Sequence, residues 1–151
     1  MTIKTNGLQG LDPGVDAARE SRTFCKFANA ESSLNSAATV ITTAGSFLNM
    51  EYGKRYIVAC AYYALTTGSD TAQFEIVTTT AHGGSGTVTA RTPKFHSGTT
   101  ATITGSLSGP MPFSPPMAFT TDDGACVAMR VLTNDAGATV NCGFTGWEEE
   151  A

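Results

Sequence analysis

The residue types that could perform nucleophilic chemistry come together in one short stretch, His82-Gly83-Gly84-Ser85-Gly86. A serine hydrolase of the α/β type carries its nucleophile in a G-x-S-x-G turn, and a helix follows that turn and helps to supply the oxyanion donors. The stretch HGGSG lacks that spacing, and no helical pattern follows it. We therefore interpret it as a flexible, glycine-rich hairpin loop and not as a catalytic turn.

The acidic residues do not suggest the pair of carboxylates that glycoside hydrolysis requires, because most of them lie in turn sequences. Asp122-Asp123-Gly124 offers two oxygen ligands close together. Calcium takes about six to eight oxygen ligands, and no D-x-D-x-D-G pattern supplies them. We interpret this stretch as a tight turn. The acids considered are Asp70, Glu75, Asp122, Asp123 and Asp135.

Four cysteines and two histidines are the remaining candidate metal ligands. No C-x-x-C pair occurs, and His82 and His96 lie in stretches rich in Gly, Thr and Pro, so no zinc site is expected. Each cysteine lies in an apolar segment typical of a strand, where a free thiol behaves as a small hydrophobic group. We expect buried thiols, no metal and no cofactor. The cysteines are Cys25, Cys60, Cys126 and Cys142.

The charge pattern argues against nucleic acid and membranes as partners. The chain has 151 residues, with 9 basic and 13 acidic side chains and a net charge of −4. The basic residues are scattered, and no glycine-rich phosphate loop precedes a helix. No apolar run approaches the ~20 residues needed to span a bilayer. The charged N-terminal stretch is not a secretory signal, so we expect synthesis in a cytoplasm.

From Thr23 onward, the elements that would have to position any site are strands. Segments rich in β-branched and aromatic residues alternate with polar turns, without helical crossovers, which predicts an antiparallel two-sheet sandwich. We predict an all-β, jelly-roll sandwich over residues 23–151, with an immunoglobulin-like sandwich as the alternative. The predicted strands are Thr23–Asn29, Ala37–Thr43, Ser46–Met50, Arg55–Thr66, Thr71–Thr80, Thr87–Arg91, Thr99–Leu107, Met117–Thr120, Ala125–Thr133 and Thr139–Trp147.

Two pairs of neighbouring strands are predicted to form β-hairpins. Arg55–Thr66 and Thr71–Thr80 flank the turn TGSD, and Ala125–Thr133 and Thr139–Trp147 flank the turn NDAG. In the second pair, alternation predicts which side chains face the core: Val127, Met129, Val131, Val140, Cys142 and Phe144.

The segment Arg55–Thr66 is apolar on both of its predicted sides. This pattern suits a strand that is covered on both faces, or one whose second face meets a neighbouring subunit. Strict alternation places one set of side chains on a single side: Tyr56, Val58, Cys60 and Tyr62.

Two further features are candidates for contact with a partner. The stretch Gly109–Met117 contains four prolines, so we expect a loop or a sheet edge that either covers the open end of the sandwich or forms a docking surface. The single tryptophan either anchors the C-terminus in the core or in a subunit interface, or stacks on a sugar. The candidate interface residues are Tyr63, Phe113 and Trp147.

Residues 1–22 form a polar N-terminal segment with few large apolar side chains and no clear period. The segment is either a floppy terminus or an extended arm that becomes ordered on a partner. In the second case, its spaced apolar residues would anchor it. The candidate contact residues of the arm are Leu8, Leu11, Val15 and Arg19.

The segments RYIVACAYYALTTGSDTAQFEIVTTT and GACVAMRVLTNDAGATVNCGFTGWEE, preceded by a short polar arm, resemble the jelly-roll capsid decoration (cement) proteins of tailed bacteriophages. The strand texture is also similar to trimeric jelly rolls of the C1q and tumour-necrosis-factor type. The resemblance implies a homotrimer on the capsid surface of the virion. It implies assembly in the host cytoplasm and binding to the major capsid protein between capsomers.

We therefore expect a structural binding protein and not an enzyme. The alternative is a receptor- or carbohydrate-binding module of a tail fibre or tailspike, which would need a groove lined by Tyr62, Tyr63 and Trp147. A hydrolase on the same scaffold would need a cleft with clustered acids and histidine.

Overall fold

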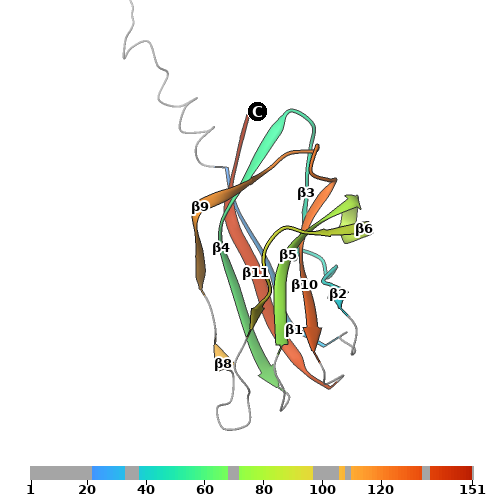
Figure 1. Cartoon of the computed structure of the whole chain (residues 1–151), viewed down its shortest axis with the longest axis vertical. Helices are drawn as coiled ribbons and strands as arrows, with labels where there is room; N and C mark the ends of the chain where they lie inside the picture. Colours follow the sequence, from blue (N-terminus) through green and yellow to red (C-terminus); the bar gives the residue numbers. More distant parts are fainter. Residues whose placement is uncertain are drawn as a thin grey trace, which may run out of the picture.

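The computed structural model describes residues 22–32, 38–67, 72–96, 106–107, 110–133 and 137–150. These residues form eleven strands and one short 3-10 turn, and the strands build two antiparallel sheets that face each other (Figure 1). The predicted all-β antiparallel sandwich is therefore confirmed. None of the described helical segments is long and apolar enough to cross a membrane.

The first sheet has its longest strands in the middle. Its order is β1-β11-β4-β8, and β9 pairs with the same edge of β4 as a continuation of β8. The C-terminal strand β11 thus lies between β1 and β4. The bounds are β1 Thr23–Glu31, β4 Lys54–Thr67, β8 Ser106–Leu107, β9 Met111–Phe119 and β11 Thr139–Glu150.

The second sheet has the order β2-β10-β5-β6, with β3 also pairing with β10 and β7 with β5. Strands β2 and β3 lie along β10 as two pieces separated by a turn, so the predicted strands in this region are shortened. The bounds are β2 Thr39–Val40, β3 Leu48–Asn49, β5 Ala72–Ala81, β6 Ser85–Ala90, β7 Phe95–His96 and β10 Cys126–Thr133.

The core lies between the two sheets and is filled by alternate residues of their inner faces. Three aromatic rings form its centre, since Tyr63 of β4 lies 5.1 Å from Phe74 and 5.7 Å from Phe95 between ring centroids. The inward orientation predicted for β10 and β11 is confirmed, because all six residues belong to the core: Val127, Met129, Val131, Val140, Cys142 and Phe144.

Strand pairing is nested from the ends of the chain toward its middle. Strand β1 pairs with β11, β2 and β3 pair with β10, β4 pairs with β9, and β5 pairs with β6. This is the pairing of one long antiparallel ribbon whose tip is the β5–β6 turn. The successive pairs of this ribbon alternate between the two sheets.

Both predicted hairpins are wrong. Strand β4 belongs to the first sheet and β5 to the second, and β10 and β11 are likewise divided between the sheets. Each of these strands hydrogen-bonds to strands other than its predicted hairpin partner, and that partner lies in the opposite sheet. The predicted hairpin turns TGSD and NDAG lie for the most part outside the described residues.

Strand β4 contains a β-bulge at Ala59. Thr145 of β11 pairs with Cys60, and the next residue, Gly146, pairs with Val58, so Ala59 has no partner in the ladder. An extra residue reverses the alternation of all side chains beyond it. The strict alternation predicted for this strand is therefore wrong after Val58. The inward side chains of β4 are Tyr56, Val58, Ala61, Tyr63 and Leu65.

The proline-rich stretch is part of the edge strand β9, which agrees with the predicted sheet edge. Its residues alternate between exposed and partly buried, and Ser114–Pro115 is a cis peptide. The apolar members of the strand pack against the core from the rim: Met111, Phe113 and Met117.

Gly146 is expected to be intolerant of any side chain, because a Cβ at this position would overlap the carbonyl oxygen of Ile57 and approach the Phe24 ring at 3.0 Å. Substitution Gly146→Ala should lower the free energy of unfolding by about 1–3 kcal/mol, as overpacking does. Urea unfolding measures this change. Thr89→Ala, at an exposed position of β6, is the control and should change it by less than about 0.5 kcal/mol.

Candidate functional site

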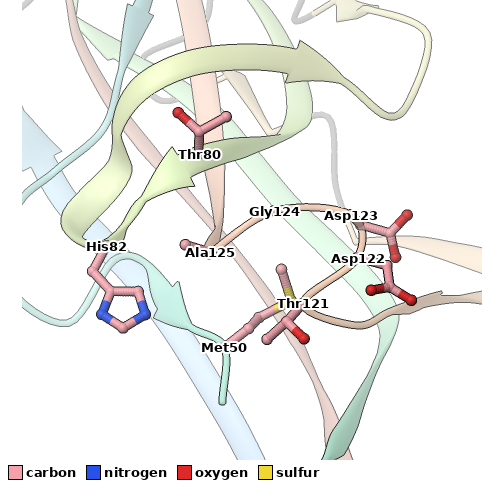
Figure 2. A pocket seen from close by; sticks show the side chains of 8 residues that line it. All are labelled: Met50, Thr80, His82, Thr121, Asp122, Asp123, Gly124 and Ala125. Atoms are coloured by element: carbon pink, nitrogen blue, oxygen red, sulfur yellow. The ribbon is translucent and has the colours of Figure 1, made fainter. Parts of the chain in front are cut away.

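The larger of two described cavities lies at one end of the sandwich, beside the β5–β6 turn, and has a volume of about 400 Å³ (Figure 2). It is lined by side chains from three loops and from the strand ends next to them. Its lining residues are Met50, Thr80, His82, Thr121, Asp122, Asp123, Gly124 and Ala125.

The polar groups of this end cavity are not arranged for catalysis. Figure 2 shows His82 at the opposite end of the cavity from Asp122 and Asp123, with Met50 and Thr121 between them. A general base must lie within hydrogen-bond reach of the group that it orients or deprotonates. His82 and the two aspartates therefore do not form a catalytic dyad.

Asp123 has a structural role in the turn that precedes β10. Its carboxylate accepts a hydrogen bond of 3.0 Å from the Thr120 backbone N–H and pairs with the Arg91 guanidinium at 3.6 Å. Arg91 also donates to the Asp123 carbonyl oxygen and to the hydroxyl of Thr78. These contacts agree with the interpretation of Asp122-Asp123-Gly124 as a tight turn.

The glycine-rich stretch HGGSG forms the 3-10 turn His82–Gly84 and the start of β6. The Ser85 hydroxyl donates to the His82 carbonyl oxygen at 3.2 Å, and the Gly83 N–H donates to the Asn49 side chain at 2.8 Å. Both contacts hold the turn in place. Within the described ranges, no group of three or more His, Cys, Asp or Glu side chains converges on a possible metal site.

A smaller cavity of about 310 Å³ lies beside β2 and contains one carboxylate, that of Glu31. Glu31 is 9% exposed and accepts a hydrogen bond from the Thr43 hydroxyl. One buried carboxylate held by a hydroxyl provides neither the acid–base pair of a glycosidase nor a metal site. Its other lining residues are Thr39, Val40, Ile41, Thr42 and Thr43.

All four cysteines are free thiols, and burial divides them into two classes. Cys126 and Cys142 are buried as expected, whereas Cys60 is half-buried and Cys25 is exposed, so the expectation of burial is wrong for Cys25. Burial, with a smaller contribution from the charge of Glu31, raises the pKa of the Cys142 thiol to about 12. Burial also raises the pKa of Cys126. Both thiols are therefore neutral at pH 7 and poor nucleophiles.

Cys25 and Cys60 lie on the outer face of the first sheet, which is the most unusual surface of the described chain. Three consecutive rows of paired residues cross β1, β11 and β4 there without a single charge, and the first two rows continue onto β9. We call these residues the charge-free face. The rows are Thr23, Trp147, Ile57 and Ala118; then Cys25, Thr145, Cys60 and Pro112; then Phe27, Gly143 and Tyr62.

The charge-free face carries two of the exposed large hydrophobic residues of the described chain. Phe27 is 41% exposed and Tyr62 is 36% exposed, and Gly143 lies between them. A Cβ at Gly143 would lie 2.8 Å from the Phe27 ring, so the ring lies against this glycine. The face therefore exposes large apolar side chains without charge, which is typical of a surface that contacts another protein.

The outer face of the second sheet is different. Arg130 and Glu75 form an ion pair on it, with Glu75 only 4% exposed. The β5–β6 turn packs beside β2, since a Cβ at Gly84 would lie 3.0 Å from the Thr42 side chain and 3.2 Å from that of Val40. The absence of charge is therefore a property of one sheet and not of the whole sandwich.

The structure separates the three predicted interface residues. Tyr63 lies in the core and is 8% exposed, because the bulge at Ala59 turns it inward; its neighbour Tyr62 occupies the surface position instead. Phe113 is partly buried and lies 6.1 Å from Phe95. Trp147 lies on the charge-free face, where its Nε1–H donates to Glu149 at 2.9 Å. The arm residues lie outside the described residues: Leu8, Leu11, Val15 and Arg19.

The charge-free face itself was missed in the sequence. The apolar character of both sides of Arg55–Thr66 was the available signal. The bulge and the pairing of β1 with β11, which together place Phe27 and Tyr62 in one row, have no local signature in the sequence.

Comparison of the chain with protein-family models, with curated proteins and with solved structures gave no match.

A cluster of three charges lies at the end of the first sheet. Glu148 pairs with Arg22 at 2.8 Å and with Lys54 at 3.1 Å, and these contacts connect the start of β1, the end of β11 and the start of β4. The hydrogen bond from Arg22, followed by that from Lys54, lowers the pKa of Glu148.

Because the pKa of Glu148 is lower in the folded chain, its stabilising contribution is present above the ordinary glutamate pKa and is lost as the pH falls through the folded pKa. Glu148→Gln should lower the free energy of unfolding by about 1 kcal/mol at pH 7. The difference from the unmodified chain should disappear toward pH 3. Urea unfolding at a series of pH values measures it. Glu150→Gln makes the same change of charge at an exposed position and should have a smaller effect.

Proposed function

We propose that this chain is a virion structural protein that decorates and stabilises an icosahedral phage capsid by binding between capsomers. The observation that supports it most directly is the charge-free face, an uncharged sheet surface with exposed apolar side chains. The described cavities of the sandwich use their polar groups to hold turns and strands. Such a molecule is suited to binding and packing, and we assign it no catalytic role.

The nested strand pairing supports a jelly-roll topology. A jelly roll is a long antiparallel ribbon that is rolled so that successive pairs of strands alternate between two sheets. We count as one arm the strands that lie end to end along the same partner: β2 with β3, β6 with β7, and β8 with β9. The described strands then form eight arms. The first sheet then contains the first, eighth, third and sixth arms, and the second sheet contains the second, seventh, fourth and fifth.

The surface composition is compatible with a permanent position on a shell. Only 15% of the residues are charged. Ordering a long charged side chain at an interface costs about 1.5–2 kcal/mol of side-chain entropy, and short threonine and serine side chains cost less. A protein that binds only the assembled shell also stabilises it by mass action. The proposed partners are the major capsid protein and two further copies of the chain, on the outer surface of the virion.

The alternative, a receptor- or carbohydrate-binding module, has less support. It requires a groove lined by aromatic rings, whereas Tyr63 lies in the core and neither described cavity is lined by Phe, Tyr or Trp. The exposed rings Phe27 and Tyr62 lie on a sheet face and not in either cavity.

The arm provides the most direct test of capsid binding. We expect that replacing Leu8, Leu11 and Val15 by Ser leaves a folded, soluble sandwich but weakens binding to undecorated heads more than tenfold. The reason is that burying each such side chain contributes about 1.5–3 kcal/mol. Co-sedimentation of the purified full-length protein with heads of the virus that encodes it measures the affinity.

The matched control replaces two polar residues of the same arm, Asn6 and Gln9, by Ser, and should bind as the unmodified chain does. Equal affinity of the apolar variant and the control would contradict the role of the arm. Failure of the unmodified protein to bind heads, combined with binding to glycans of the host surface, would favour the receptor-binding alternative.

A further inference from the structure

We propose that the charge-free face is a self-association surface, which packs against another copy of this chain. The inference deepens the proposed function, because it assigns to one surface the subunit contact that a decorating oligomer requires. Three properties of the face support it: its uncovered apolar rows, its charge and its area.

The face is apolar but has no cover among the described elements. Phe27 and Tyr62 are 41% and 36% exposed in the middle of a sheet, and Cys25, Ala118 and Pro112 are also exposed. Two other side chains of the outer face are covered by their neighbours. Ile57, in the first row of the charge-free face, is 7% exposed, and Ala64 of β4 is 6% exposed. The exposed rings thus lie on a closely packed surface.

Charge restricts the surface through which another copy of the chain can bind. Each copy carries a net charge of −4, so two copies repel one another over most of their surfaces. The three rows of the charge-free face bring no charge into a contact, which avoids the cost of burying an unpaired ion. Trp147 needs no polar partner from the other copy, because its N–H already donates to Glu149.

The rim of the face is polar. Arg55 and Glu149 form an ion pair in the row beyond Trp147, and at the other end the sheet carries Asn141 and Thr66. An apolar centre with a polar rim is the usual composition of a protein interface.

The area of the sheet is that of a stable interface. The strands lie about 4.8 Å apart and rise about 3.3 Å per residue, so over the length of β11 the outer face of the sheet has an area of about 750 Å². This area includes both the charge-free face and its polar rim. A stable protein–protein interface buries about 800 Å² on each partner. One outer face of this sheet is therefore large enough for one contact between copies.

The test compares two tyrosines that receive the same substitution. Tyr62→Arg places a charge in the third row of the face, whereas Tyr52→Arg changes a tyrosine that is 92% exposed in the turn before β4. Sedimentation velocity over a range of protein concentrations measures the mass of each. We expect two or three copies for the unmodified chain and for Tyr52→Arg, and a dissociation constant at least 100-fold higher for Tyr62→Arg.

A second measurement needs no variant. Cys25 is exposed in the single chain, so self-association should slow its reaction with a maleimide at least tenfold as the protein concentration rises, with the labelled residue identified by mass spectrometry. An unmodified chain that is monomeric at all concentrations, with a constant labelling rate, would overturn the inference. Equal association of the two tyrosine variants would also overturn it.

The outcomes for the two proposals can be separated. A monomer that binds heads would overturn the self-association surface and leave the decoration function standing. Oligomers that are lost in Tyr62→Arg but never bind heads would support the surface and contradict the decoration function.

Discussion

The insertion of the last strand between the first strand and β4 is the constraint on which the rest of the structure depends. Without β11, the first sheet would consist of β1 and a separate pair formed by β4 and β9, with no hydrogen bonds between them. The core would lose Val140, Cys142 and Phe144 from its centre. The charge-free face would be divided as well, because Thr145, Gly143 and Trp147 are the middle members of its three rows.

The same strand has to fit closely on both sides, and its glycines make this possible. A side chain at Gly143 would overlap the carbonyl oxygen of Lys26, and one at Gly146 would overlap that of Ile57. Gly146 also lies opposite the bulge at Ala59, where β4 changes the side to which its side chains point. One irregularity thus allows β4 to contribute Tyr56 and Tyr63 to the core and Tyr62 to the surface, although the three residues are close in sequence.

The two-residue period of strands made much of the fold predictable. Val127, Met129 and Val131 alternate with less apolar neighbours, and this pattern correctly indicated the inner face of β10. The turn sequences did not reveal which strands pair, because a loop that joins two sheets uses the same Gly, Asn and Asp residues as a hairpin turn. The position of Tyr63 in the core could not be predicted, because a bulge has no local sequence signature and shifts every later position. The charge-free face depends on pairing between strands more than a hundred residues apart, which periodicity does not reveal.

The pairing of β1 with β11 also has a consequence for biosynthesis. Thr23 has its ladder partner in Trp147, so the first sheet cannot close before residues up to Trp147 have been synthesised. Contacts so distant in sequence make folding slow, and exposed strand edges on incomplete chains favour aggregation. The surface that we assign to contact between copies is therefore completed only when β11 has paired with both β1 and β4.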